Sequence, residues 1–84
     1  MGTNSFDSLN IILASAKLSY RKPNLQHLKI LLQEWAANFY NTILEETQFL
    51  INDNTLEVTT DNKRMFNELK QFTYECDFLK IMFV

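Results

Sequence analysis

Two short runs of β-branched and aromatic residues, Thr47–Ile51 and Thr55–Thr60, flank the tripeptide Asn52-Asp53-Asn54. Asn and Asp tolerate turn and left-handed backbone conformations, so the tripeptide predicts a chain reversal between two antiparallel strands. In the second run, Leu56 and Val58 alternate with polar residues, which predicts one buried and one solvent-facing side. A chain of 84 residues that contains this hairpin must build the rest of its core against it.

Before the hairpin, apolar residues recur at steps of three and four, the spacing of one face of a helix. Pro23 separates two such stripes, which predicts two helices, because the residue before a proline avoids the helical region. We expect Ser5 and Asn24 to cap these helices through their side-chain oxygens. Trp35 is expected to anchor the core, and His27 lies off the stripe. The first stripe is Phe6, Leu9, Leu13, Ala16 and Tyr20, and the second is Leu25, Leu28, Leu32, Trp35, Phe39 and Ile43.

After the hairpin, the pattern returns to helical spacing and then ends in an apolar run. Thr60 or Asp61 is expected to cap a third helix. Its apolar stripe is Met65, Leu69, Phe72 and Cys76, with Cys76 as a buried thiol. The final residues, 77–84, predict a strand whose core-facing side carries Leu79, Ile81 and Phe83.

These elements predict an α+β fold of order ααββαβ, a single domain with a small three-stranded sheet and the helices packed on one face. An all-helical fold is the alternative, but it would require residues 47–60 to form one long loop. In the α+β fold, Phe78, Lys80 and Met82 point to the face without helices. Exposed aromatic and Met side chains there predict a partner surface or a homodimer contact, and a free strand edge has the same implication.

Composition excludes several kinds of chemistry. The chain has one Cys, one His and one Gly, so it cannot form an internal disulfide, a Cys-based zinc site or a Gly-rich phosphate loop. No His, Cys or carboxylate cluster has metal-ligand spacing, and we expect neither a cofactor nor catalysis. No segment is apolar enough to span a membrane, and the polar start predicts a cytoplasmic protein without a secretory leader.

Short motifs follow one another along nearly the whole chain. They are Ser5-Phe6-Asp7-Ser8-Leu9-Asn10-Ile11-Ile12-Leu13, Leu31-Leu32-Gln33-Glu34-Trp35, Thr47, Leu56-Glu57-Val58, Glu68-Leu69 and Ile81-Met82-Phe83. In this order they resemble the DciA-like family of bacterial replicative-helicase loaders. The resemblance implies a KH-like fold and a non-catalytic module that docks on the replicative helicase or related replication machinery.

The resemblance also implies DNA contact, which needs cations on one face. The candidates are Lys17, Arg21, Lys22, Lys29, Lys63 and Arg64. Family members are usually basic, whereas this chain has a net charge of −2 and a pI of about 5.2. A KH domain that clamps a nucleotide backbone also needs a Gly-x-x-Gly loop, which is absent. We therefore expect protein contact rather than sequence-specific nucleic-acid binding.

Two other functions remain open. The apolar terminal strand favours a homodimeric structural or regulatory protein, of the kind that phages or mobile elements encode, without a nucleic-acid role. The other is weak binding of single-stranded DNA, in which the basic patches would contact phosphates and Phe or Tyr side chains would stack on bases.

Overall fold

The computed structural model describes residues 4–17, 24–40, 47–74 and 76–84. It contains three helices and three strands in the predicted order ααββαβ, which confirms the α+β fold and excludes the all-helical alternative. The elements are α1 (Ser5–Lys17), α2 (Leu25–Tyr40), β1 (Thr47–Asn52), β2 (Thr55–Thr60), α3 (Lys63–Thr73) and β3 (Leu79–Phe83).

The predicted hairpin is present, and its register runs without a break from Thr47 opposite Thr60 to Asn52 opposite Thr55. Asp53 occupies the turn with φ of 55°, the left-handed conformation that Asp tolerates better than most residues. β3 then pairs with β2 in parallel, and the sheet order is β1-β2-β3. Both outer strands of the sheet are therefore edges within the described part of the chain.

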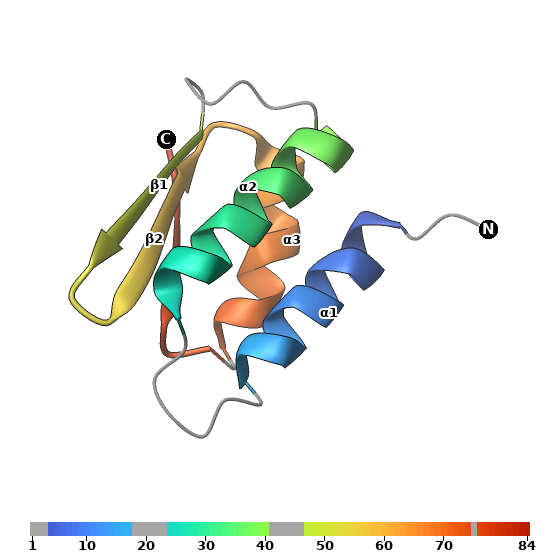
Figure 1. The fold of residues 1–84 in the computed structure, drawn as a ribbon. Helices are drawn as coiled ribbons and strands as arrows, with labels where there is room; N and C mark the ends of the chain where they lie inside the picture. The colour runs from blue at the N-terminus through green and yellow to red at the C-terminus, as the bar shows by residue number, and fades with distance from the viewer. Residues whose placement is uncertain (1–3, 18–23, 41–46, 75) are drawn as a thin grey trace.

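All three helices lie on one side of the sheet (Figure 1). α2 packs against β1 and β2, α3 packs against β2 and β3, and α1 packs on α2 and α3. The other face of the sheet is not covered by any described element. No helix among the described residues has the length and apolar character needed to cross a membrane.

One apolar core joins the sheet to the helices, and Trp35 is its largest fully buried side chain. As predicted, Leu56 and Val58 from β2 point into this core. Burial of apolar area at about 25 cal/mol per Å² makes such a core the main stabilising contribution. The buried apolar side chains are Leu9, Leu13, Leu28, Leu32, Trp35, Ala36, Phe49, Leu56, Val58, Met65, Leu69, Phe72, Cys76, Leu79 and Ile81.

One polar pair is buried at the end of the hairpin, beside the start of α3. The hydroxyl oxygens of Thr47 and Thr60 lie 3.0 Å apart in a hydrogen bond. The Thr60 hydroxyl also accepts a bond from the backbone N–H of Asn62 at 3.1 Å. This chain of bonds links β1 and β2 to the first turn of α3 without leaving either hydroxyl unpaired.

Two of the three predicted helix caps are wrong by one or two positions. Asn4, not Ser5, caps α1, because its side-chain oxygen accepts the backbone N–H of Asp7 at 2.8 Å. Asn62, not Thr60 or Asp61, caps α3 and accepts the N–H of Met65 at 3.0 Å. Asn24 caps α2 as predicted, by accepting the N–H of His27. At both wrong positions several adjacent residues are of capping type, so composition could not select among them.

Four residues of the predicted stripes and terminal strand also differ. Phe6, at the start of α1, is 43% exposed, although its ring contacts that of Phe72. Phe39 lies in the last turn of α2, beyond the final buried residue Ala36, and is 38% exposed. Phe83 is 50% exposed because β3 is an edge strand and only one side of the ring meets α3. Cys76 is buried as expected, but it follows the end of α3 at Thr73 rather than lying on the helix. Tyr20 and Ile43 lie outside the described residues.

Candidate functional site

The uncovered face of the sheet is the first candidate surface. Strand alternation and register place Leu50, Glu57 and Lys80 in one row across it, because Leu50 pairs with Glu57 and Glu57 with Lys80. A second row contains Gln48, Thr59 and Met82. The face is therefore mostly polar, with opposite charges on neighbouring strands and two apolar side chains.

Of the three residues predicted to form a partner surface, Lys80 is exposed and the other two are partly buried. The prediction that Phe78 points to the outer face is wrong, because its side chain is partly buried and packs against the core just before β3 begins. Met82 is half-buried on the outer face. Sequence reasoning missed Leu50, which is 60% exposed. Leu50 stands between Phe49 and Ile51, whose side chains point inward, so strand alternation could have placed Leu50 on the outer face.

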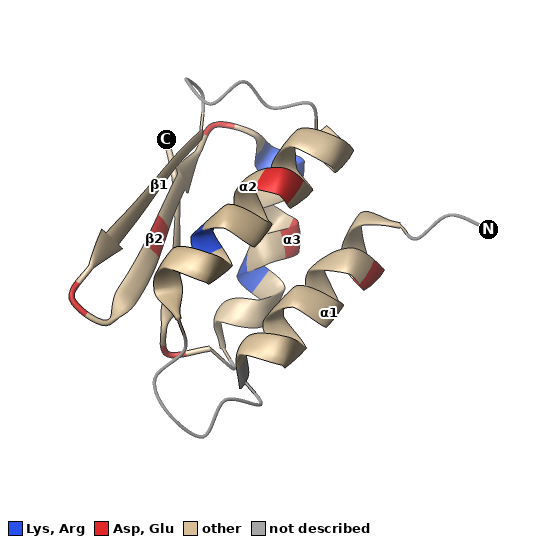
Figure 2. Cartoon of the chain, in the orientation of Figure 1, with Lys and Arg blue, Asp and Glu red and all other residues tan. Residues whose placement is uncertain are grey.

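The described basic candidates are divided among the three helices. Lys29 lies on α2 and is partly buried, whereas Lys63 and Arg64 are exposed in the first turn of α3. Figure 2 shows the basic segment of α2 apart from those of α3. Lys17 is the last residue of α1, and Arg21 and Lys22 lie outside the described residues. A continuous DNA-binding face through all six residues stays a prediction.

A second candidate surface lies where α3 meets β3. The ring of Phe66 contacts the ring of Phe83, with 5.4 Å between the centroids and 57° between the planes. The Lys70 ammonium lies 5.3 Å from the centre of the Phe66 ring, a cation–π distance. We call Lys63, Phe66, Lys70 and Phe83 the α3–β3 patch. Sequence reasoning missed this patch, because the apolar alternation of the terminal run predicts Phe83 inside the core and Phe66 lies off the predicted stripe of the third helix.

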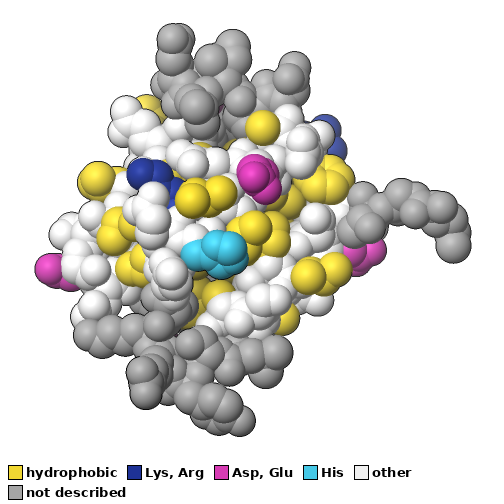
Figure 3. Space-filling view, in the orientation of Figure 1, with side chains coloured by type: hydrophobic (Ala, Val, Ile, Leu, Met, Phe, Trp, Pro, Cys, Tyr) yellow, Lys and Arg dark blue, Asp and Glu magenta, His cyan; other side chains and the backbone are white. Residues whose placement is uncertain are grey.

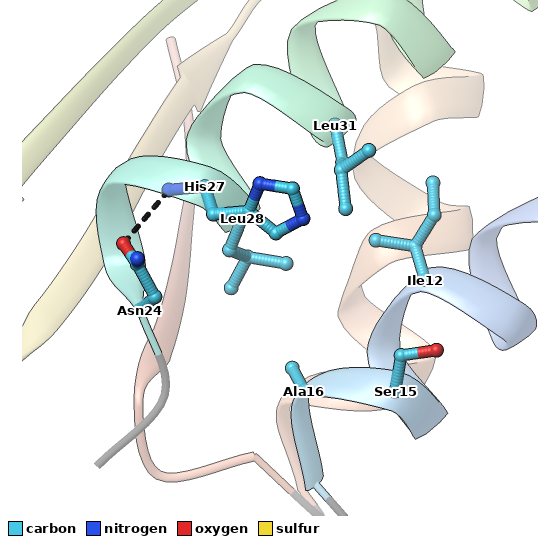
Figure 4. A pocket seen from close by; sticks show the side chains of 7 residues that line it. All are labelled: Ile12, Ser15, Ala16, Asn24, His27, Leu28 and Leu31. Atoms are coloured by element: carbon cyan, nitrogen blue, oxygen red, sulfur yellow. Dashed lines mark hydrogen bonds between the residues drawn. The ribbon is translucent and has the colours of Figure 1, made fainter. Parts of the chain in front are cut away.

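A cleft of about 230 Å³ separates the second half of α1 from the first half of α2. Its walls are mostly apolar, and Figure 4 shows Ile12 and Leu31 facing each other across it while the His27 ring lies alongside. The same histidine is visible at the surface among apolar side chains in Figure 3. His27 is exposed, as expected. The space suits an apolar group and offers few polar contacts. Its lining residues are Ile12, Ser15, Ala16, Asn24, His27, Leu28 and Leu31.

Among the described residues, no group of three or more His, Cys, Asp or Glu side chains could hold a metal ion. Within that same part of the chain, Cys76 is a buried thiol. Burial removes its sulfur from solvent, as expected of a structural thiol.

Comparisons of the chain with protein-family models, with curated proteins and with solved structures found no match. The fold class therefore comes from the structure itself, and the resemblance to the DciA-like family enters below as a proposal.

Proposed function

We propose that this chain is a cytoplasmic, non-catalytic protein-interaction module that docks on the replicative helicase or associated replication machinery. The single observation that carries the interaction role is the one-sided packing of the helices, which leaves the opposite sheet face open. The element order ααββαβ is the one that the DciA-like resemblance requires, and it supports the choice of partner.

The open sheet face has the features of a modest protein interface. Leu50 on the edge strand β1 provides an exposed apolar side chain, and the same row continues with Glu57 on β2 and Lys80 on β3. An apolar side chain beside polar groups can contribute to such a contact. Three strands present a small area, which favours a transient rather than a permanent complex.

Calorimetric titration of the chain with a bacterial replicative helicase tests this function. We expect saturable binding that Leu50→Asp weakens about tenfold, because it replaces the exposed apolar side chain of this face by a charge. Ile11→Asp is the matched control, since Ile11 is equally exposed but lies on α1, away from the sheet. Absence of any heat of binding with the wild-type chain would reject the helicase as the partner.

A homodimer is the second candidate function. The observation that favours it is the edge strand β3, whose exposed Phe83 and Val84 leave apolar surface at its end. Pairing of this edge with a second copy would bury that surface. Light scattering after size exclusion decides the question, and a strict monomer at the highest soluble concentration rejects the homodimer.

A further inference from the structure

We infer that the α3–β3 patch binds an extended, acidic peptide segment of a partner protein, which anchors an apolar side chain on Phe66 and Phe83 and pairs its carboxylates with Lys63 and Lys70. This inference rests on the proposed role as a protein-interaction module and specifies its second surface and the chemistry of its ligand. It uses a different part of the molecule from the open sheet face.

The helix spacing places the required groups on one flank of α3. Lys63, Phe66 and Lys70 are separated by three and four residues, so their side chains form one stripe beside β3. Arg64 and Glu68 are likewise four apart and form a stripe on the other flank, where Glu68 accepts a bond from Ser5 of α1. The cations beside Phe83 are therefore the two lysines, and Arg64 provides a matched cation outside the patch.

The aromatic rings provide an apolar anchor that is still open to solvent. Phe83 is 50% exposed, although it contacts Phe66. Phe66 is partly buried by the core, which fixes the position of the pair. The Lys70 ammonium already lies over the Phe66 ring, so a carboxylate that reaches it meets a positioned charge beside an apolar surface.

β3 supplies the backbone partner for an extended segment. It is an edge strand of the described sheet, and its register with β2 continues through the bonds from Leu56 to Phe78 and from Val84 to Thr60. Its inner side is fully used by β2, so its outer N–H and C=O groups face outward. A peptide added there gains main-chain hydrogen bonds and brings alternate side chains over the α3–β3 patch.

The surrounding charges favour a peptide over a nucleic acid. Asp61 precedes α3 and Asp77 precedes β3, so an exposed carboxylate stands near each end of the patch. A single nucleic-acid strand carries a phosphate at every nucleotide and would meet these carboxylates as it leaves the two lysines. A peptide can instead restrict its acidic residues to the positions opposite Lys63 and Lys70.

Fluorescence anisotropy with a labelled octapeptide that carries Glu, Phe and Glu at successive alternate positions, with Thr at the positions between them, tests the inference on the full chain. We expect saturable binding that weakens with salt and falls about tenfold in Lys63→Glu/Lys70→Glu. Phe83→Ser should weaken it similarly through the lost anchor, with the fold checked by circular dichroism. Arg64→Glu is the control and should bind as the wild type does.

Four outcomes overturn the inference: no binding of the octapeptide, equal binding of a peptide with Lys in place of Glu, unchanged affinity in the double lysine variant, or concentration-dependent dimerisation that the Phe83 variant abolishes. Preferential binding of a labelled oligothymidine would assign the patch to nucleic acid instead. Helicase titration of the same variants separates the two proposals. Helicase binding without peptide binding overturns only this inference, and peptide binding without helicase binding overturns only the helicase function.

Discussion

The indole N–H of Trp35 donates a hydrogen bond to the backbone carbonyl of Ser5 at 2.8 Å, and this bond fastens α2 to the first turn of α1. The Ser5 hydroxyl in turn donates to a carboxylate oxygen of Glu68 at 2.8 Å. One residue thus connects all three helices, with its carbonyl facing α2 and its hydroxyl facing α3. A carbonyl oxygen has two lone pairs, so the contact with Trp35 is compatible with the helical bond that α1 requires.

Trp35→Phe tests the contribution of the indole N–H. We expect a loss of about 1–2 kcal/mol in the free energy of unfolding, because the bond to Ser5 and part of the buried ring are removed. Urea denaturation followed by circular dichroism measures it. Phe39→Leu, on the same helix but exposed, should change the free energy by less than about 0.5 kcal/mol. Equal effects of the two substitutions would contradict the assigned role of Trp35.

The bond between Ser5 and Glu68 is tested by a double-mutant cycle with Ser5→Ala and Glu68→Ala. We expect a coupling energy of about 0.5–1 kcal/mol, because the pair is partly buried and joins α1 to α3. Denaturant unfolding of the four proteins provides the values. Additive effects of the two substitutions would show that the hydroxyl and the carboxylate do not interact in solution.

Thr60→Val should destabilise the chain by about 1–3 kcal/mol, since it removes the partner of both the Thr47 hydroxyl and the Asn62 N–H. Thr47→Val should cost less, because the Thr60 hydroxyl can still accept from Asn62. Thermal unfolding measures both. Thr59→Val on the outer face of the same strand is the control and should remain within about 0.5 kcal/mol of wild type. A larger loss in the Thr47 variant would contradict the bond arrangement.

Asp53→Gly should stabilise the hairpin by about 0.5–1 kcal/mol, because the positive φ of this residue suits glycine. Asp53→Val should destabilise it by a larger amount, since a β-branched side chain resists the left-handed conformation. The midpoint of urea unfolding reports both changes. If the two variants have the same stability, the turn does not keep this backbone conformation in solution.

The hairpin could be predicted because its evidence is local. The turn residues stand between two alternating runs, and strand alternation alone places Leu56 and Val58 on the buried side. The helix stripes were equally local, which is why Leu9, Leu28 and Leu69 are in the core as expected. The capping residue of α1 was not predictable, because Asn4 and Ser5 have similar capping preferences. Only the folded structure brings Glu68 close enough to accept the hydrogen bond of the Ser5 hydroxyl.

The α3–β3 patch could not be predicted, because it depends on distant pairing. Phe66 and Phe83 meet only after β3 has joined β2 in parallel. Phe83 is half exposed because β3 lies at an edge of the sheet. The apolar pattern of the terminal run does not show that this strand is at an edge. The burial of Phe78 has the same origin, since it lies at the entry to that strand rather than on its outer face.

The strand at the other edge of the sheet has a consequence for handling the protein. β1 reads Thr-Gln-Phe-Leu-Ile-Asn, and it contains no charge, no proline and no bulge against β2. Such uncharged hexapeptides form cross-β stacks when they lose their neighbours, and edge lysines or prolines are the usual protection. Partial unfolding that frees β1 is therefore expected to produce fibrillar aggregates rather than a soluble unfolded state, and a lysine in place of the exposed Gln48 should oppose this stacking.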